Sequence, residues 1–255
     1  MPIEENSSSS GVDLSNLGAT RQQLSHKVEK TPDAIINRYR ENKNWKIHQK
    51  EWIYKNLLKP GMEVLDFGCG TGEISTQVAM LGAKKVYSVD VTPGLLDVTA
   101  RRAELDGVGD RVETICDFIQ NVPPRQCDLV IAFAVLHHCH PISGIMPELL
   151  KWLKPGGTFV CVEPLVYFDS LEKIRVASGV PFEPLDEGEH KLSAEDVEYV
   201  CNSLDNPQRV HFRLVGRADR WLPDLAVARV DWMLFKLPLM WKLAGSVLIH
   251  GKKRG

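Results

Sequence analysis

Three glycines at alternate positions constrain this chain more than any other feature of its sequence. They follow a short apolar run, and the segment reads Val64-Leu65-Asp66-Phe67-Gly68-Cys69-Gly70-Thr71-Gly72. Glycine lets the backbone take positive φ and approach a ligand closely, and a helix that begins behind such a turn presents free N–H groups with a partial positive charge. The segment therefore predicts a strand, a tight turn and a helix, with a site for a polar ligand at the end of the strand.

Short strands and helices alternate along most of the remaining chain. β-Branched runs are separated by helical stretches, which is typical of stacked βαβ units and a parallel sheet. Helices are expected at about residues 72–81, from Pro93 to just before Gly107, and from the capping box at Ser193 to about Leu204. Strands are expected at residues 63–67, 85–90, 112–116, 127–134, 158–162, 209–215 and 246–250.

The spacing of the glycines separates three kinds of ligand. A dinucleotide fingerprint is G-x-G-x-x-G, but here the third glycine comes one place early, at Gly72. A phosphate-binding loop needs G-x-x-x-x-G-K-[ST], which the segment lacks. The acids Asp66 and Glu73 also disfavour a pyrophosphate, whereas Asp66 can pair with the ammonium of a methionine moiety. The spacing favours this kind of ligand over a dinucleotide.

Two further acids end the next two predicted strands. Asp90 follows the glycine turn by about twenty residues, where a carboxylate accepts hydrogen bonds from ribose hydroxyls. Asp117 ends the third strand and can accept from an adenine amino group, with Phe118 beside the ring. A single acid of this kind is more often a cap or a loop residue. Three acids at three strand ends together indicate a nucleoside site.

These residues resemble the class I S-adenosylmethionine (SAM)-dependent methyltransferases, specifically the group that acts on small molecules and lipids. The likeness covers about residues 51–164 well and the flanks in outline. Besides the glycine segment it rests on four short motifs: Val89-Asp90, Cys116-Asp117-Phe118, Phe133-Ala134-Val135-Leu136-His137-His138 and Leu153-Lys154-Pro155-Gly156-Gly157.

The resemblance implies a fold, a cofactor and a set of binding residues. The fold is α/β, a Rossmann-like seven-stranded sheet, mostly parallel with an antiparallel last strand, flanked by helices. The cofactor is SAM, which leaves as S-adenosylhomocysteine. The residues implied to bind it are Asp66, Gly68, Gly70, Gly72, Asp90, Val91, Asp117, Phe118, Ala132 and Phe133.

Histidines are the candidates for a general base. Methyl transfer from a sulfonium mainly needs a positioned acceptor, and a base with a pKa near the working pH helps when the acceptor is a hydroxyl. His138, after the fourth strand, is the first candidate, and His190 is the alternative. A metal site is not expected, because the adjacent residues 137–140 cannot easily converge on one ion and no second cluster has ligand spacing.

Composition excludes some partners and compartments. The 255 residues carry a formal net charge of −2, so no global basic field attracts nucleic acid. The six cysteines are scattered, several of them within apolar runs, which indicates buried free thiols in a reducing, cytoplasmic compartment. No apolar h-region of a signal peptide stands in the first residues.

The flanks of the core are expected to recognise the acceptor. Residues 1–20 are predicted to be disordered, 21–60 to form helices that cover the acceptor site, and 61–255 to form the methyltransferase domain, with an apolar insertion at about 221–243. The insertion can cap a substrate, support a homodimer instead of a monomer, or touch a membrane peripherally, which is less favoured. The expected acceptor is a small apolar molecule. Methylation of RNA or protein, and SAM binding without turnover, are the alternatives.

Overall fold

The computed structural model describes residues 46–168, 190–212 and 224–254, together with 170, 173 and 214. Residues 1–45, with the predicted disordered segment and part of the predicted N-terminal helices, lie outside the described residues, as do residues 221–223 of the predicted insertion. The strands are β1 Glu63–Phe67, β2 Lys85–Asp90, β3 Val112–Cys116, β4 Cys127–Phe133, β5 Leu153–Pro164, β6 Leu204–Phe212 and β7 Ser246–Lys253.

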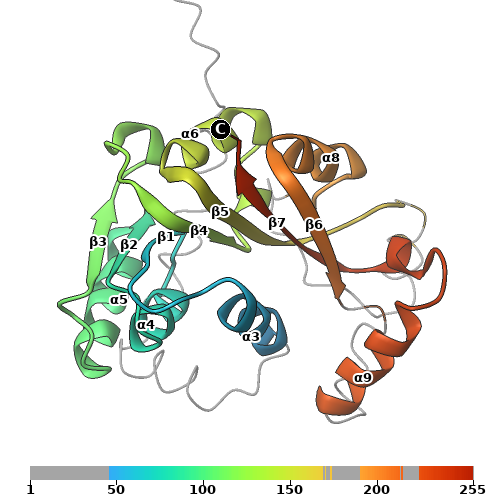
Figure 1. The fold of residues 1–255 in the computed structure, drawn as a ribbon, viewed down its shortest axis with the longest axis horizontal. Coiled ribbons are helices and arrows are strands. Elements are labelled where there is room, and N and C mark those ends of the chain that lie inside the picture. Colours follow the sequence, from blue (N-terminus) through green and yellow to red (C-terminus); the bar gives the residue numbers. More distant parts are fainter. Residues whose placement is uncertain are drawn as a thin grey trace, which may run out of the picture.

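These strands form a seven-stranded sheet in the order β3-β2-β1-β4-β5-β7-β6 (Figure 1). β1 to β5 pair in parallel, and β7 runs antiparallel between β5 and β6. The predicted Rossmann-like sheet with an antiparallel last strand is confirmed. The strand order reverses at β1 and β4, and in open parallel sheets ligands bind outside the carboxyl ends of the strands at such a point.

Three strands begin and end as the sequence predicts, and four differ. β4 ends one residue earlier than predicted, at Phe133, and β7 continues three residues further, to Lys253. The bounds of β1, β2 and β3 match, whereas β5 begins at Leu153 because the predicted Lys154–Gly157 turn is a bulge within it. Along β4, the partner residue jumps from Leu153 to Thr158 between Cys127 and Leu129. β6 begins at Leu204, five residues earlier than predicted, and ends at Phe212.

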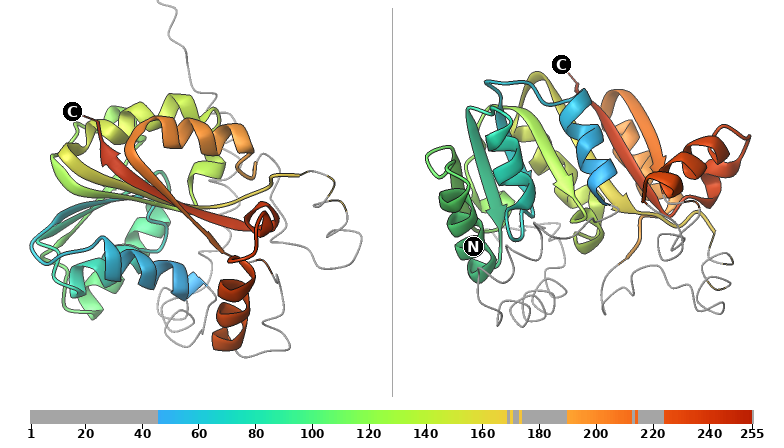
Figure 2. Two further views of the ribbon diagram at one scale, coloured as in Figure 1. Left: turned by 45° about the vertical axis from the view of Figure 1, so that its right-hand side comes forward. Right: turned by 90° about the horizontal axis from the view of Figure 1, so that it is seen from below.

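Helices cover both faces of the sheet (Figure 2). The capping box at Ser193 and Asp196 is present, but its helix ends at Asn202, before Leu204. The α-helices are α3 Lys46–Asn56, α4 Glu73–Met80, α5 Pro93–Leu105, α6 Ile142–Lys151, α8 Ala194–Asn202 and α9 Asp224–Leu234, and the 3-10 helices are η1 Ile119–Asn121, η2 Leu136–His138 and η4 Met240–Leu243.

Alternate residues of the central strands fill two cores. Leu149 of α6 and Val197 of α8 pack with Phe159 on one face, and Ile53 of α3 and Val78 of α4 pack with Leu129 on the other. Leu129, Val130, Ile131 and Ala132 of β4 have no exposed surface, as expected of a parallel strand buried on both faces. The turns at the strand ends are thus held on a rigid, close-packed frame.

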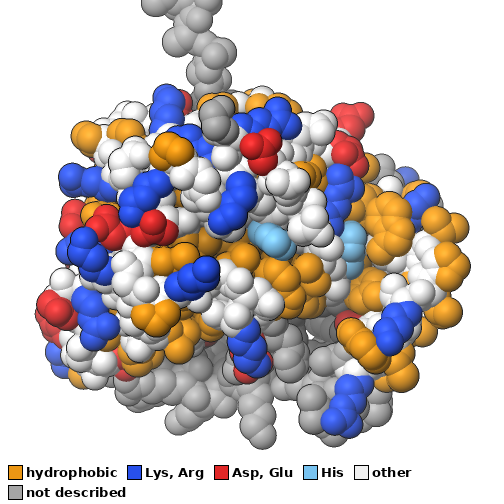
Figure 3. Space-filling model, in the orientation of Figure 1, with side chains coloured by type: hydrophobic (Ala, Val, Ile, Leu, Met, Phe, Trp, Pro, Cys, Tyr) orange, Lys and Arg blue, Asp and Glu red, His pale blue; other side chains and the backbone are white. Residues whose placement is uncertain are grey.

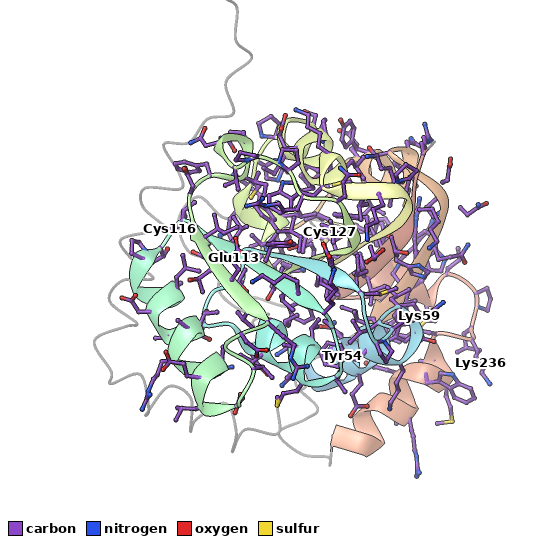
Figure 4. All side chains as sticks on the ribbon, turned by 60° about the vertical axis from the view of Figure 1, so that its left-hand side comes forward. Tyr54, Lys59, Glu113, Cys116, Cys127 and Lys236 are labelled. Atoms are coloured by element: carbon purple, nitrogen blue, oxygen red, sulfur yellow. The ribbon has the colours of Figure 1, made fainter. Side chains whose placement is uncertain are left out.

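The insertion between β6 and β7 contains α9 and η4 and lies at one corner of the molecule (Figure 1). Of the helices within the described ranges, none has the length and apolar character to cross a membrane. The six cysteines are free thiols, and four of them (Cys127, Cys139, Cys161 and Cys201) are buried, in line with the prediction. Cys116 is exposed at the end of β3 (Figure 4).

Candidate functional site

The glycine turn follows β1 and occupies the carboxyl edge of the sheet. Gly68, Gly70 and Gly72 all have positive φ, at 66°, 54° and 72°. A Cβ on Gly72 would collide with the Thr99 side chain of α5, so this glycine is required by helix packing. A Cβ on Gly70 would meet nothing within 4 Å, and its backbone lines two cavities. Gly70 therefore leaves room where a ligand would approach.

Two cavities meet at the glycine turn. The first has a volume of about 210 Å³, and the second about 220 Å³. Gly68, Gly70 and Ala134 line both of them. The two cavities are thus neighbours that share walls at the glycine turn and just after β4.

The first cavity brings together the acids of the second and third strand ends. Its lining includes Asp90, Val91, Asp117, Phe118 and His138. These residues come from the ends of β2 and β3 and from η2, and the lining surface is largely apolar. A cavity of this kind, with few polar groups on apolar walls, suits a nucleoside.

Asp90 has a structural role in this turn besides any role in binding. Its Oδ2 accepts a hydrogen bond from the Gly70 N–H at 2.9 Å, and its Oδ1 accepts from the Thr92 N–H at 2.9 Å. Burial raises the pKa of this carboxyl above its usual value, while the two backbone hydrogen bonds oppose the rise. Since each carboxylate oxygen has two acceptor positions, Asp90 can bind hydroxyls while holding the turn.

Asp117 is more exposed and is held locally. Its Oδ1 accepts hydrogen bonds from the Phe118 N–H at 2.7 Å and from the Asn121 side-chain amide at 2.9 Å. These contacts orient the carboxylate at the end of β3, and the half-buried Phe118 lies next to it on the cavity wall. Both residues thus line the first cavity at the end of β3.

The second cavity has a charged lining. Asp66, Glu73 and Phe133 face it, and so does Lys50 of α3. Asp66 is almost fully buried and accepts a hydrogen bond of 2.6 Å from the Ser75 hydroxyl. Burial raises the pKa of Asp66 to about 6, with the Ser75 hydrogen bond opposing the rise. The Asp66 carboxyl is thus poised to ionise near neutral pH.

Lys50 is the functional candidate that sequence reasoning missed. Its Nζ lies 2.6 Å from Glu73 Oε1 and 5.5 Å from the centre of the Phe133 ring. A lysine on a helix is usually solvated, so nothing in the local pattern distinguishes it. Tyr54, which lies one helical turn after Lys50 and is labelled in Figure 4, donates a hydrogen bond of 2.7 Å to Gln77 of α4. That contact ties α3 to the helix behind the glycine turn.

The histidine segment after β4 is anchored by a buried acid. Glu163 of β5 accepts hydrogen bonds from the N–H groups of Val135 and Leu136 at 2.9 and 2.8 Å, and its Oε2 lies 2.7 Å from His137 Nδ1. His137 therefore has a structural role, as its burial also indicates. His138, the next residue of η2, lines the first cavity.

Three predicted site residues line neither cavity, and the first of them, Gly72, serves helix packing instead. Ala132 is fully buried in the core and lines neither cavity. His190 is exposed and lines neither, although its backbone N–H donates to the His137 carbonyl and its ring lies 5.1 Å from that of His140. Within the described part of the chain, no three His, Cys, Asp or Glu side chains gather as a metal site.

Comparison with known families now identifies the core. The sequence profile of the family described as "Methyltransferase domain" matches residues 64–157. These residues include the glycine turn and the two acids of the first cavity, Asp90 and Asp117. Residues 64–157 form a methyltransferase domain. The cofactor of this domain is SAM, and the elongated pair of cavities fits it, since one compartment suits a nucleoside and the other an amino acid.

Relatives of the methyltransferase domain differ in how much of this chain they match. A ribosomal protein L11 methyltransferase of Acinetobacter baumannii is 36% identical over 111 residues, which covers 43% of this chain and 36% of that relative. The match thus spans about a third of that relative's length. A demethylmenaquinone methyltransferase of Symbiobacterium thermophilum is 28% identical over 248 residues, covering 91% of this chain and 92% of the relative.

Among solved structures, the N-methyltransferase NodS of Bradyrhizobium japonicum in complex with S-adenosylhomocysteine has the same fold. Its TM-score is 0.60 at 13% sequence identity, over 92% of this chain and 99% of that one. The methyltransferase fold thus extends well beyond residues 64–157.

Proposed function

We propose that this protein transfers a methyl group from SAM to a small apolar acceptor. The observation that carries the proposal is the pair of cavities that meet at Gly70, one lined by Asp90 and Asp117 and the other by Asp66. Such a cavity pair matches a nucleoside joined to a charged amino acid.

The residues of the first cavity would hold the nucleoside. Asp90 would accept hydrogen bonds from the ribose hydroxyls and Asp117 from the adenine amino group, while Val91 and Phe118 would pack against the ring. In the second cavity, Asp66 would face the ammonium of the methionine tail. Gly68 and Gly70 would let the backbone contact the cofactor closely.

The reaction would take place where the two cavities meet. SAM supplies a methyl group already activated on a sulfonium, so the chain's own residues need only hold the acceptor, exclude water and remove a proton. His138 lines the first cavity, whereas His190 is exposed and lines neither cavity, so His138 is the better placed base.

Similarity to one relative over nearly the whole chain supports a small apolar acceptor. The relative that matches 91% of this chain is a demethylmenaquinone methyltransferase, so the likeness extends over the flanks as well as the core. The L11 methyltransferase likeness is confined to 43% of the chain and gives no support to a ribosomal protein acceptor.

Calorimetry with S-adenosylhomocysteine, followed by a transfer assay, tests this function. The wild type should bind S-adenosylhomocysteine, and Asp90→Asn should bind it at least about tenfold more weakly because charge-assisted hydrogen bonds are lost. His138→Ala should keep the affinity and lose transfer of labelled methyl to reduced demethylmenaquinone, small phenols or amines. A wild type that binds no S-adenosylhomocysteine would overturn the proposal. Binding without any methylated product would favour a SAM-binding protein without turnover.

A further inference from the structure

The second cavity has an unusual charge arrangement for a site that must accept a carboxylate. Asp66 and Glu73 bring two acids to its wall, and among the described lining residues Lys50 is the cation. The tail of SAM has an ammonium and a carboxylate. Two acids suit the ammonium, but they repel the carboxylate unless a positive charge lies close by.

Lys50 is placed to supply that charge. Its side chain is 7% exposed and its Nζ lies 2.6 Å from Glu73 Oε1. A lysine is almost never so buried unless it is paired or bound. The positive charge of Lys50 also lowers the pKa of Asp66, against the larger effect of burial. Lys50 thus already acts on the acid proposed to face the ammonium.

The backbone that carries Lys50 is fixed on two sides. The side-chain amide of Gln49, one residue earlier, donates a buried hydrogen bond of 2.8 Å to Ser246 of β7. Tyr54, one turn later, bonds to Gln77 of α4. Because α3 is held at both the sheet and α4, the ammonium of Lys50 is preorganised, and little side-chain entropy is lost when a ligand binds.

We propose that Lys50 binds the α-carboxylate of the cofactor's amino acid tail, so that α3, outside the glycine-motif core, completes the cofactor site. The inference rests on the proposed function. An ammonium has three donors and can serve Glu73 and a carboxylate together. A consequence is that the cofactor's carboxylate docks α3 more firmly against the core.

Two ligands that differ only in the carboxylate test the proposal. Calorimetry is carried out with S-adenosylhomocysteine and with its decarboxylated analogue, on the wild type and on Lys50→Met. The variant should lose between about tenfold and a hundredfold in affinity for S-adenosylhomocysteine, since charge-assisted hydrogen bonds are lost. The measurement is made well above the pKa of Asp66, so that Asp66 is ionised with or without Lys50. The affinity of the variant for the decarboxylated analogue should then not fall, which also shows that the variant is folded. Lys50→Arg should recover part of the loss.

The matched control lies on the same helix. Lys55 pairs with Glu51 in solvent, with a side chain that is 73% exposed, so Lys55→Met should bind both ligands as the wild type does. Hydrogen exchange gives a second readout. S-adenosylhomocysteine should slow exchange of the α3 amides in the wild type more than the decarboxylated analogue does.

The failure of this inference differs from the failure of the proposed function. If Lys50→Met weakens both ligands equally, or neither, Lys50 does not bind the carboxylate, and the proposal is wrong while the cofactor assignment stands. If the wild type binds neither ligand, the proposed function is itself wrong.

Discussion

Asp66 is the residue at which burial and function oppose each other most clearly. Burial raises the pKa of this carboxyl to about 6, and the ammonium of the cofactor requires its ionised form. The folded protein holds the Asp66 proton more tightly than the unfolded chain does. The stability this contributes is therefore present at low pH and is lost as the pH rises through about 6.

The same pKa predicts how cofactor affinity depends on pH. Below pH about 6, each further unit should weaken S-adenosylhomocysteine binding by up to about tenfold, because Asp66 must release its proton first. Calorimetry between pH 5 and 7.5 measures this dependence. Asp66→Asn should bind more weakly at neutral pH and lose the dependence. A variant that keeps the wild-type pH profile would assign the titration to another group, such as Asp90.

Sequence reasoning at this scale succeeded where residue type and position in a motif determine the environment. Asp90 and Phe118 line the first cavity because they end parallel strands, whose carboxyl ends share one edge. It failed for Lys50, which reaches the site by tertiary packing of a flanking helix. Sequence reasoning also could not show that Gly72 makes room for Thr99. That contact depends on how α5 packs against the start of α4, and β2 separates the two helices in the sequence.

At the scale of elements, the segment after β4 depends on Glu163 from the neighbouring strand. The carboxylate accepts from the N–H groups of Val135 and Leu136 and lies against His137 Nδ1, so it fixes the start of η2 and thereby the place of His138. Glu163 has 1% of its surface exposed, and no solvent can replace these bonds.

Glu163→Gln should therefore destabilise the protein. The amide offers one acceptor oxygen instead of two and turns its N–H donors toward the backbone N–H of His137, which leaves a buried group unsatisfied at a cost of about 1–3 kcal/mol. Urea unfolding at pH 7 measures the loss. Glu148→Gln, on the solvent side of α6, is the control and should change little, since its ion pair with Lys151 is exposed. Equal stability of the two variants would contradict the anchoring role.

The observed strand ends show where sequence patterns predict the bounds of a strand and where they do not. β1, β2 and β3 match their predictions because turns or glycines bound each of them. β6 is predicted to start at Arg209, after Asn206 and Pro207, and proline ordinarily interrupts a strand. The strand in fact begins before them, and the irregularity between Asp205 and Gln208, with φ of 50° at Asn206, accommodates the proline.

At the scale of the whole molecule, the α9–η4 corner combines an inner and an outer surface. The inner surface packs Trp241 against Tyr167 and His211, with ring centres 5.1 and 5.6 Å apart. The outer surface exposes Trp232, Met233, Leu237 and Leu239 by more than half. Figure 3 shows hydrophobic and basic side chains together at this corner, and Figure 4 shows Lys236 on its outer side.

Two tryptophans nine residues apart in this corner distinguish packing from exposure. Trp241→Ser should lower the free energy of unfolding by about 2 kcal/mol or more, because the ring fills the space between β6 and η4. Trp232→Ser should lower the free energy of unfolding by less than about 1 kcal/mol. Trp232 is 63% exposed, and its ring centre lies 3.4 Å from Lys236 Nζ at the surface. Urea unfolding at two protein concentrations measures both changes.

If Trp232→Ser is as costly as Trp241→Ser, the outer surface is covered in the folded protein. A concentration-dependent midpoint would then identify the cover as a second copy of the chain, because mass action makes a dimer's stability depend on concentration and a monomer's independent of it.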